Sequence, residues 1–256
     1  MSLLLNRARQ SYRALLERLR LRWHRLRGRR VVHFLHVGNT GGTAIKAALT
    51  GQVSRTTHLR FHGHGFLLRH VPRGDGLVFF VRDPVSRFTS GFNSRRRKGQ
   101  PRHFFEWSEG EAEAFSRFET ANDLALALSA NHEFHTEARR AMRSVRHVRD
   151  SYWTWFESEA YFRSRWTDVL CIGSQETFRG SFVALCERLG LSPDLPLPED
   201  EVGANRSPVG QDRHLDPEAV ANLRSWFEAD YRFVTLCQAY RDQVTEEESA
   251  RSPARP

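Results

Sequence analysis

Lysine, cysteine and long apolar runs are scarce in this chain, and each scarcity narrows what the protein can be. Only Lys46 and Lys98 are lysines among its 39 basic residues, so arginine supplies nearly all of the positive charge. The three cysteines are scattered and match neither a metal-binding spacing nor a disulfide framework, which favours a reducing, cytoplasmic compartment. No apolar stretch approaches the roughly 20 residues of a membrane-spanning helix, and no signal-peptide pattern is visible.

The length and charge of the chain favour one α/β domain with acidic partners. With 256 residues, the chain is long enough to bury a sizeable core. Its formal net charge is +9, and a basic chain attracts nucleotides, anionic sugars, nucleic acid or anionic membranes. We therefore expect a basic segment at 1–30, a folded domain at 31–245 and a disordered tail at 246–256.

The segment 1–30 has apolar residues at helical spacing among many arginines. A helix of this kind can lie on an anionic membrane with its apolar face at the interface, which would place the protein at the inner face of the membrane. The same pattern fits a helix that packs on the domain, and periodicity alone does not separate the two interpretations.

A glycine-rich turn between two apolar segments is the feature around which the domain is organised. Residues 31–37 predict a buried strand, and residues 44–49 predict a helix. The turn between them consists of Gly38, Asn39, Thr40, Gly41, Gly42 and Thr43. Backbone N–H groups and the positive end of the helix dipole converge in such a turn, which can bind phosphate or sulfate. The turn could also simply join the strand to the helix. It is not a Walker A motif, because no lysine precedes Thr43.

Four histidines follow the first predicted helix, at His58, His62, His64 and His70. A zinc site is disfavoured, since neither cysteine nor carboxylate lies nearby and the spacing fits no common site. A histidine here could act as a general base, because its pKa lies near neutrality. Each one could equally be an ordinary surface residue.

Residues 77–81 predict a second buried strand, in a parallel sheet that is covered on both faces. Arg82-Asp83-Pro84 ends this strand, and a helix is expected to begin near Pro84. The strand-end guanidinium of Arg82 and the helix hydroxyl of Ser90 could meet one phosphate, a role that suits the donor fork of arginine. The other interpretation is a strand–helix turn that Asp83 caps.

The remaining sequence predicts further helices and one more strand. Helices are expected over 111–129, 133–149 and 182–189 and after Asp216, and a strand over 168–173. The basic cluster at 95–98 could attract an anionic acceptor or form a solvated face. The aromatic residues of 150–166 most simply fill the core.

The two motifs together resemble the sulfotransferases that use 3′-phosphoadenosine 5′-phosphosulfate (PAPS), in particular a bacterial-like, single-domain form of the carbohydrate (heparan-sulfate-type) branch. The phosphosulfate loop of that branch commonly reads His, an apolar residue, Pro, Lys, Thr, Gly or Ala, Gly, Thr. This chain has His36-Val37-Gly38-Asn39-Thr40-Gly41-Gly42-Thr43, so glycine replaces the proline and Asn39 replaces the lysine. The family motif that holds the 3′-phosphate is matched by Arg82, Arg87, Phe88 and Ser90. Weaker matches lie at 172–178, 205–208 and 226–231.

The resemblance spans about residues 31–240 and implies a P-loop-like sulfotransferase fold, in which helices flank a central parallel sheet. It implies transfer of a sulfuryl group from PAPS to a hydroxyl or amine of a carbohydrate or glycolipid acceptor, with no metal. Residues 38–43 with Arg82, Arg87 and Ser90 would bind PAPS. His64 of the Gly63-His64 pair would be the general base, with His62 in reserve. We further expect Lys46 to replace the missing loop lysine, unless Arg82 or Arg87 supplies that charge.

Two other classes of protein fit parts of the sequence. A P-loop-like kinase would prefer ATP with magnesium. A non-catalytic basic module would bind an anionic polymer through 95–98 and the N-terminal helix. No nucleic-acid-binding motif is present, so we expect no nucleic acid partner.

Overall fold

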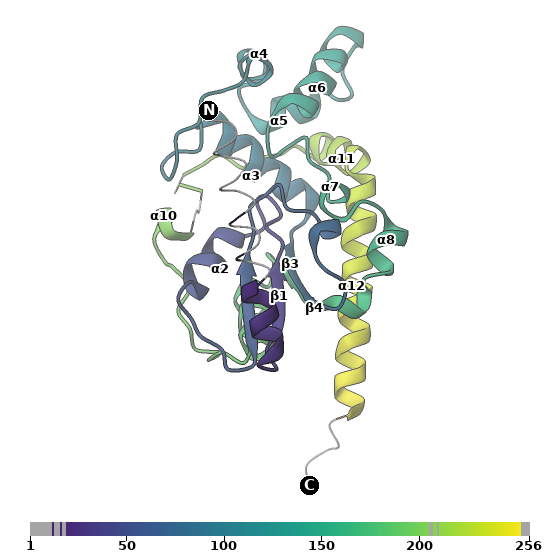
Figure 1. Ribbon diagram of the computed structural model, residues 1–256. Coiled ribbons are helices and arrows are strands. Elements are labelled where there is room, and N and C mark those ends of the chain that lie inside the picture. Colours follow the sequence, from purple (N-terminus) through teal and green to yellow (C-terminus); the bar gives the residue numbers. More distant parts are fainter. Residues whose placement is uncertain (1–11, 13–15, 17–18, 205–206, 209, 252–256) are drawn as a thin grey trace.

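A four-stranded parallel sheet organises the chain in the computed structural model, which describes residues 12, 16, 19–204, 207–208 and 210–251 (Figure 1). The strands are β1 (Arg30–Phe34), β2 (Thr57–Phe61), β3 (Gly76–Val81) and β4 (Val169–Ser174), in the order β2-β1-β3-β4. All neighbouring pairs are parallel. The expected α/β class, with a central parallel sheet between helices, is confirmed.

Helices cover both faces of the sheet, which explains why every residue of β3 is buried. Val78 and Phe80 face one side, where they pack with α2 (Gly42–Leu49) and α9 (Phe178–Leu189). Leu77, Phe79 and Val81 face the other side. The helices packed there are α7 (Trp153–Phe156), α8 (Glu159–Arg163) and α12 (Glu228–Arg251).

Three of the four strands agree with the strands predicted at 31–37, 77–81 and 168–173. Strand β2 lies at the edge of the sheet, within the histidine-rich stretch, and was not predicted. Four of its five residues are only partly buried, and two of the five are His58 and Arg60. An edge strand of this composition lacks the apolar run that identifies a buried strand.

A second group of helices surrounds a separate apolar cluster beside the sheet. This group consists of the helices α3 (Pro84–Arg96), α4 (Glu109–Arg117), α5 (Ala121–Leu126), α6 (His132–Ser144) and α11 (Pro217–Trp226). The single helix predicted over 111–129 is two helices, because Thr120 starts a new helix with a capping box that it shares with Asp123. Short helical turns lie at η1 (Leu68–His70), η2 (Trp166–Asp168) and α10 (Glu201–Ala204).

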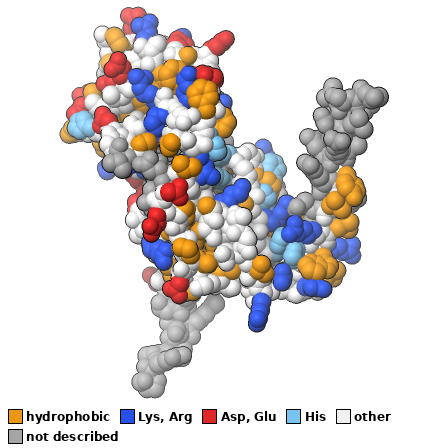
Figure 2. Space-filling view, turned by 90° about the vertical axis from the view of Figure 1, so that its left-hand side faces the viewer, with side chains coloured by type: hydrophobic (Ala, Val, Ile, Leu, Met, Phe, Trp, Pro, Cys, Tyr) orange, Lys and Arg blue, Asp and Glu red, His pale blue; other side chains and the backbone are white. Residues whose placement is uncertain are grey.

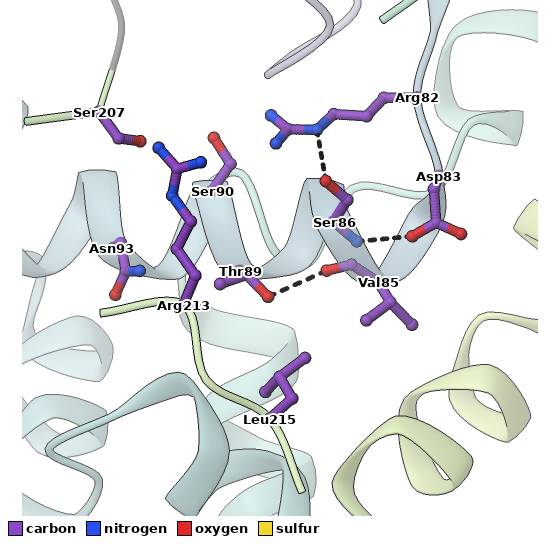
Figure 3. A pocket seen from close by; sticks show the side chains of 10 residues that line it. All are labelled: Arg82, Asp83, Val85, Ser86, Thr89, Ser90, Asn93, Ser207, Arg213 and Leu215. Carbon is purple, nitrogen blue, oxygen red and sulfur yellow. Dashed lines mark hydrogen bonds between the residues drawn. The ribbon is translucent and has the colours of Figure 1, made fainter. Parts of the chain in front are cut away.

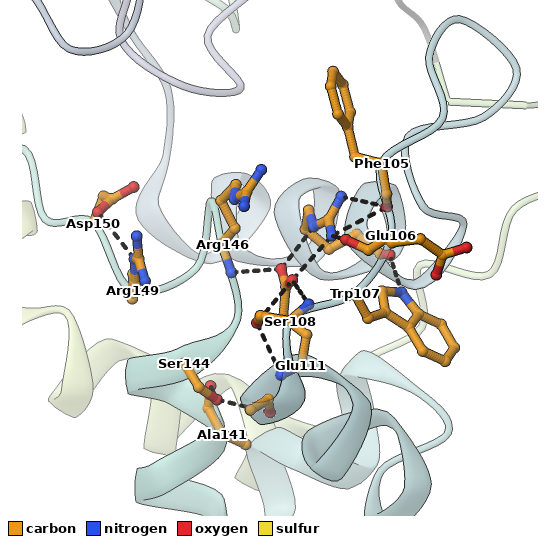
Figure 4. Close-up of polar contacts among 12 residues, drawn as sticks. Phe105, Glu106, Trp107, Ser108, Glu111, Ala141, Ser144, Arg146, Arg149 and Asp150 are labelled. Carbon is orange, nitrogen blue, oxygen red and sulfur yellow. Dashed lines mark hydrogen bonds and ion pairs between the residues drawn. The ribbon is translucent and has the colours of Figure 1, made fainter.

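Glu111 on α4 is the centre of a buried polar network (Figure 4). The Nε of Arg95 donates to Glu111 Oε1 at 2.7 Å, and the backbone N–H groups of Ser108 and Arg146 donate to the same carboxylate. Burial opposes ionisation of Glu111, but these donors outweigh it and hold the pKa at about 2. Arg95 therefore belongs neither to a solvated face nor to an acceptor surface.

The two ends of the chain differ from the sequence-based division into segments. Residues 19–26 are helical, and Leu21 and His24 of this helix are buried. Helix α12 continues to Arg251, so the first six residues of the predicted disordered tail are helical, with a Gln243–Glu247 hydrogen bond one turn apart. The rest of that tail, and most of 1–18, lie outside the described residues. Every helix in the described part of the chain is too short or too polar to span a bilayer.

Candidate functional site

The glycine-rich turn leads into an uncapped helix N-terminus. Gly41, with φ +87°, is the N-cap of α2, and within the described residues no side chain caps the first turn of that helix. Because the first N–H groups of a helix have no acceptor within it, they are available to an anion. The hydroxyl of Thr40 donates to the carbonyl of Val37 at 3.0 Å. This bond fixes the turn, and it directs the hydroxyl proton away from the helix N-terminus.

Two loop glycines are required by the packing of the protein itself. A Cβ atom on Gly41 would lie 2.4 Å from the ring of Phe178 and 2.6 Å from Gln175 Oε1. A Cβ atom on Gly42 would lie 2.5 Å from the ring of His36. The turn is therefore held between His36 on one side and the segment after β4 on the other, with or without a ligand.

Two buried polar atoms beside the turn lack a hydrogen-bond partner in the described part of the chain. One is Asn39 Nδ2, on a residue with the left-handed φ of +61°, and the other is Gln175 Oε1. Leaving such atoms unpaired costs about 1–3 kcal/mol each. A donor and an acceptor that are unpaired next to available N–H groups fit a site that a polar ligand completes.

Arg82 connects the turn to α3. Its Nε donates to the Ser86 hydroxyl at 2.9 Å, and its Nη1 donates to the carbonyl of Asn39 at 3.3 Å. Asp83 caps α3 by accepting from the N–H of Ser86 at 2.8 Å, so the predicted cap is also present. The strand end thus positions one guanidinium between the glycine turn and the first turn of α3.

A pocket of about 250 Å³ opens along α3. Figure 3 shows the guanidinium groups of Arg82 and Arg213 turned toward it, together with the hydroxyls of Ser86, Ser90 and Ser207. The structure therefore brings Arg82 and Ser90 together as the sequence predicts. Arg213 enters from the segment before α11, far away in the sequence. Because Arg213 lies in no local motif, the residues around it do not predict that it lines a binding pocket. Two cations and several hydroxyls around one pocket suit a phosphate group.

Arg87 does not line this pocket, so its predicted part in binding the nucleotide stays a prediction. Its guanidinium is buried 3.6 Å from Asp230 Oδ1, donates to the carbonyl of Asp150 and lies 4.6 Å from the centre of the Tyr152 ring. Ser86 and Ser90 are four residues apart and share one side of α3, whereas Arg87 is turned by about 100° from Ser86. Arg87 therefore joins α3 to α12.

His64 lies beside the glycine turn, next to His36 and His147. Its Nδ1 is 3.0 Å from the carbonyl oxygen of His36, and its own carbonyl accepts from Trp155 Nε1 at 2.8 Å. The His64 ring centre is 4.1 Å from that of His36 and 5.7 Å from that of His147. Because a carbonyl oxygen only accepts, Nδ1 of His64 carries a proton, and in the neutral form of the ring Nε2 is then the acceptor.

His36 and His147 are neutral neighbours of His64. Burial, followed by the nearby His64 and Lys46, lowers the pKa of His36 to about 3. Burial, followed by His64 and nearby arginines, lowers the pKa of His147 to about 4. Lys46 is exposed, yet its charge acts on His36, so the lysine lies within electrostatic reach of this cluster. His36 is part of the loop motif, whereas no sequence motif includes His147, which only the fold brings next to His64.

His62 belongs to a different group of side chains. Its Nε2 is 2.9 Å from Nδ1 of His33, whose Nε2 is 3.0 Å from Asp75 Oδ2. Its ring stacks on Phe66 at 3.5 Å. Burial, followed by the neighbouring His33, lowers the pKa of His62 to about 3. Its contacts within the described residues do not involve 38–43, so the geometry favours His64 over His62 as the histidine of the site.

Comparisons with known proteins add no neighbour to this description. Neither a family model nor a curated protein nor a solved structure matches the chain. Among the described residues, no group of three or more His, Cys, Asp or Glu side chains is placed to hold a metal ion.

Proposed function

We propose that the protein is a PAPS-dependent sulfotransferase of P-loop-like fold. The observation that carries the proposal is the position of Arg82, which hydrogen-bonds to the glycine turn and also lines the pocket with Ser90 and Arg213. PAPS carries two separate anionic groups, the phosphosulfate and the 3′-phosphate. The turn and the pocket supply two adjacent groups of donors for them.

The two groups of donors would divide the nucleotide between them. The N–H groups at 38–43 and the positive end of α2 would hold the phosphosulfate. Arg82, Ser90 and Arg213 would hold the 3′-phosphate through charge-assisted hydrogen bonds. Fixed N–H groups and cations of this kind can hold the charge that develops during transfer, so no metal is required.

His64 would act as the general base toward the acceptor. Its Nε2 would take the proton of the acceptor hydroxyl while the hydroxyl oxygen bonds to sulfur and the bond between sulfur and the bridging phosphate oxygen breaks. The products are a sulfate ester and adenosine 3′,5′-bisphosphate. Lys46 would offset the charge on the departing phosphate, in place of the lysine that Asn39 replaces. A carbohydrate or glycolipid hydroxyl is the acceptor class that the resemblance favours.

Titration calorimetry with adenosine 3′,5′-bisphosphate and with AMP tests the nucleotide site. We expect the bisphosphate to bind about 10–100-fold more tightly than AMP, which is the effect of one or two charged hydrogen bonds. Within the described residues the Ser90 hydroxyl makes no hydrogen bond to another protein group, so Ser90→Ala should weaken bisphosphate binding without unfolding the domain. Arg143→Ala, an exposed arginine on α6, is the matched control for Arg82→Ala and Arg213→Ala.

Three results would contradict the proposal. Equal affinity for AMP and the bisphosphate would remove the 3′-phosphate site. A preference for ATP with magnesium would favour a kinase. Salt-sensitive binding of an anionic polymer without turnover of PAPS would favour a binding module. A screen of sugars, lipids and phenols with labelled PAPS then identifies the acceptor.

A further inference from the structure

The helix near the N-terminus turns one apolar face away from the protein. Residues 19–26 are helical, as are Tyr12 and Leu16. Five large apolar side chains here are 45–79% exposed, namely Tyr12, Leu16, Leu19, Trp23 and Leu26. At about 100° per residue, these positions fall within an arc of about 80° on a helix. We name these five side chains the apolar stripe.

The opposite face of this helix is fixed to the domain. Leu21 and His24 are buried, and the ring of His24 stacks on that of His58 in β2 at 3.7 Å. The guanidinium of Arg25 pairs with Asp75 through two contacts, at 3.2 Å and 2.5 Å. Since these contacts define the rotation of the helix, the apolar stripe faces outward because of the fold.

Arginines border the apolar stripe on both sides. At helical spacing, the exposed Arg20 and Arg27 lie on one side of it and the exposed Arg22 on the other. The guanidinium of Arg27 lies 4.0 Å from the centre of the Trp23 ring. Residues 1–30 contain ten arginines and one acidic residue, Glu17. Figure 2 shows hydrophobic (orange) and basic (blue) side chains next to one another on its right-hand side.

This combination of charge and shape selects one kind of partner. Pairing of two copies through the apolar stripe would bring the arginines of both together, which is unfavourable. An anionic bilayer offers apolar depth for leucine and tryptophan, and phosphates at the level of the arginines. We propose that the apolar stripe and its bordering arginines dock the protein on an anionic lipid membrane. This proposal does not rest on the sulfotransferase proposal.

Sedimentation of the full chain with vesicles tests the docking. We expect binding to phosphatidylcholine vesicles that contain phosphatidylserine, and much weaker binding to phosphatidylcholine alone. Each arginine near an anionic surface contributes about a fivefold gain in partitioning. The triple variant Arg20→Gln/Arg22→Gln/Arg27→Gln should therefore bind roughly 100-fold more weakly. Leu19→Ser/Trp23→Ser should also lose most of the binding.

Matched controls lie on α6, which carries one exposed phenylalanine and three exposed arginines. Arg139→Gln/Arg140→Gln/Arg143→Gln removes the same number of charges as the helix variant, and separately Phe134→Ser removes one exposed aromatic side chain, both without touching the N-terminal helix. Circular dichroism verifies that each variant is folded, and this check does not depend on nucleotide binding. The proposal is overturned if wild type does not bind anionic vesicles, or if the α6 variants lose as much binding as the helix variants. Dimerisation through the apolar stripe in ultracentrifugation would also overturn it.

Discussion

Lys46 is the residue on which the proposed chemistry depends most directly. The turn carries Asn39 where the resembling loops carry lysine, and the charge of Lys46 already reaches His36 beside the turn. If Lys46 stabilises the departing phosphate, Lys46→Ala should lower turnover of PAPS about 10²–10³-fold, the usual effect of losing one preorganised contact to a transition state. The measurement is release of labelled sulfate to an acceptor found by screening.

The control for this prediction is the other lysine of the chain. Lys98 pairs with Glu106 at 2.7 Å, and Lys98→Ala should leave turnover unchanged. Turnover of Lys46→Ala within a few-fold of wild type would show that Lys46 has no such role. A sharp rise in turnover on Asn39→Lys would then indicate that the natural site is a weakened one.

At the scale of a single element, the conformation of the glycine turn can be tested at Gly41. An alanine there must adopt φ +87° and place its Cβ 2.4 Å from the Phe178 ring. We expect Gly41→Ala to cost about 1–3 kcal/mol in the free energy of unfolding and to weaken bisphosphate binding. Urea unfolding and calorimetry measure the two effects.

Gly180 supplies the comparison for Gly41. It lies in α9, and a Cβ atom added to it would meet no heavy atom within 4 Å. Gly180→Ala should be neutral or stabilise the protein by about 0.4–1 kcal/mol. Equal effects of Gly41→Ala and Gly180→Ala on the free energy of unfolding and on bisphosphate binding would show that the backbone geometry of the turn does not require glycine at position 41.

Two of the ion pairs that α4 makes, those of Glu111 and Glu113, differ in burial, and this difference predicts their contributions to stability. Glu111→Ala removes the only carboxylate that pairs with the buried Arg95 within the described residues and leaves two backbone N–H groups without a partner, so we expect a loss of about 3–5 kcal/mol in the free energy of unfolding. Glu113 pairs with Arg140 at 2.9 Å in an exposed position, so Glu113→Ala should cost less than about 1 kcal/mol. Equal losses in chemical denaturation would contradict this ranking.

For the molecule as a whole, histidines couple folding to pH. The pKa values of His36 and His62 are lowered to about 3 and that of His147 to about 4, in each case mainly by burial. Unfolding lets these groups bind protons below their ordinary pKa of 6.5, so stability falls as the pH drops from 6.5 toward 4. Each such histidine contributes about 2 kcal/mol between pH 7 and pH 5, so we expect the free energy of unfolding to fall by several kcal/mol over this interval.

A variant at position 147 isolates part of this effect. His147 has φ +69°, a conformation that asparagine tolerates, so His147→Asn removes a titrating group with little strain. Its stability should depend less steeply on pH than that of wild type. Replacing the exposed His132 by glutamine is the control for the loss of one imidazole. An unchanged slope in His147→Asn would show that His147 does not contribute.

The features that could be predicted from the sequence are those formed within short stretches of the chain. The apolar runs at 31–37, 77–81 and 168–173 correspond to three strands, because continuous burial leaves a continuous apolar pattern. The spacing from Arg82 to Ser90 placed both at one pocket, because a strand end and the two helical turns after it have nearly fixed geometry. The same local rules did not reveal that Arg87 turns toward Asp230.

Contacts between side chains that are far apart in the sequence are visible only in the tertiary structure. Arg213 reaches the pocket along α3, His147 approaches His64, and Arg95 is buried against Glu111, although none of these contacts has a signature in the local sequence. The separation of His62 from His64 likewise follows from the way β1 and β2 pair, which turns His62 toward His33. The physical reason is that periodicity and turn chemistry act over a few residues, whereas a binding site is assembled by the packing of a whole core.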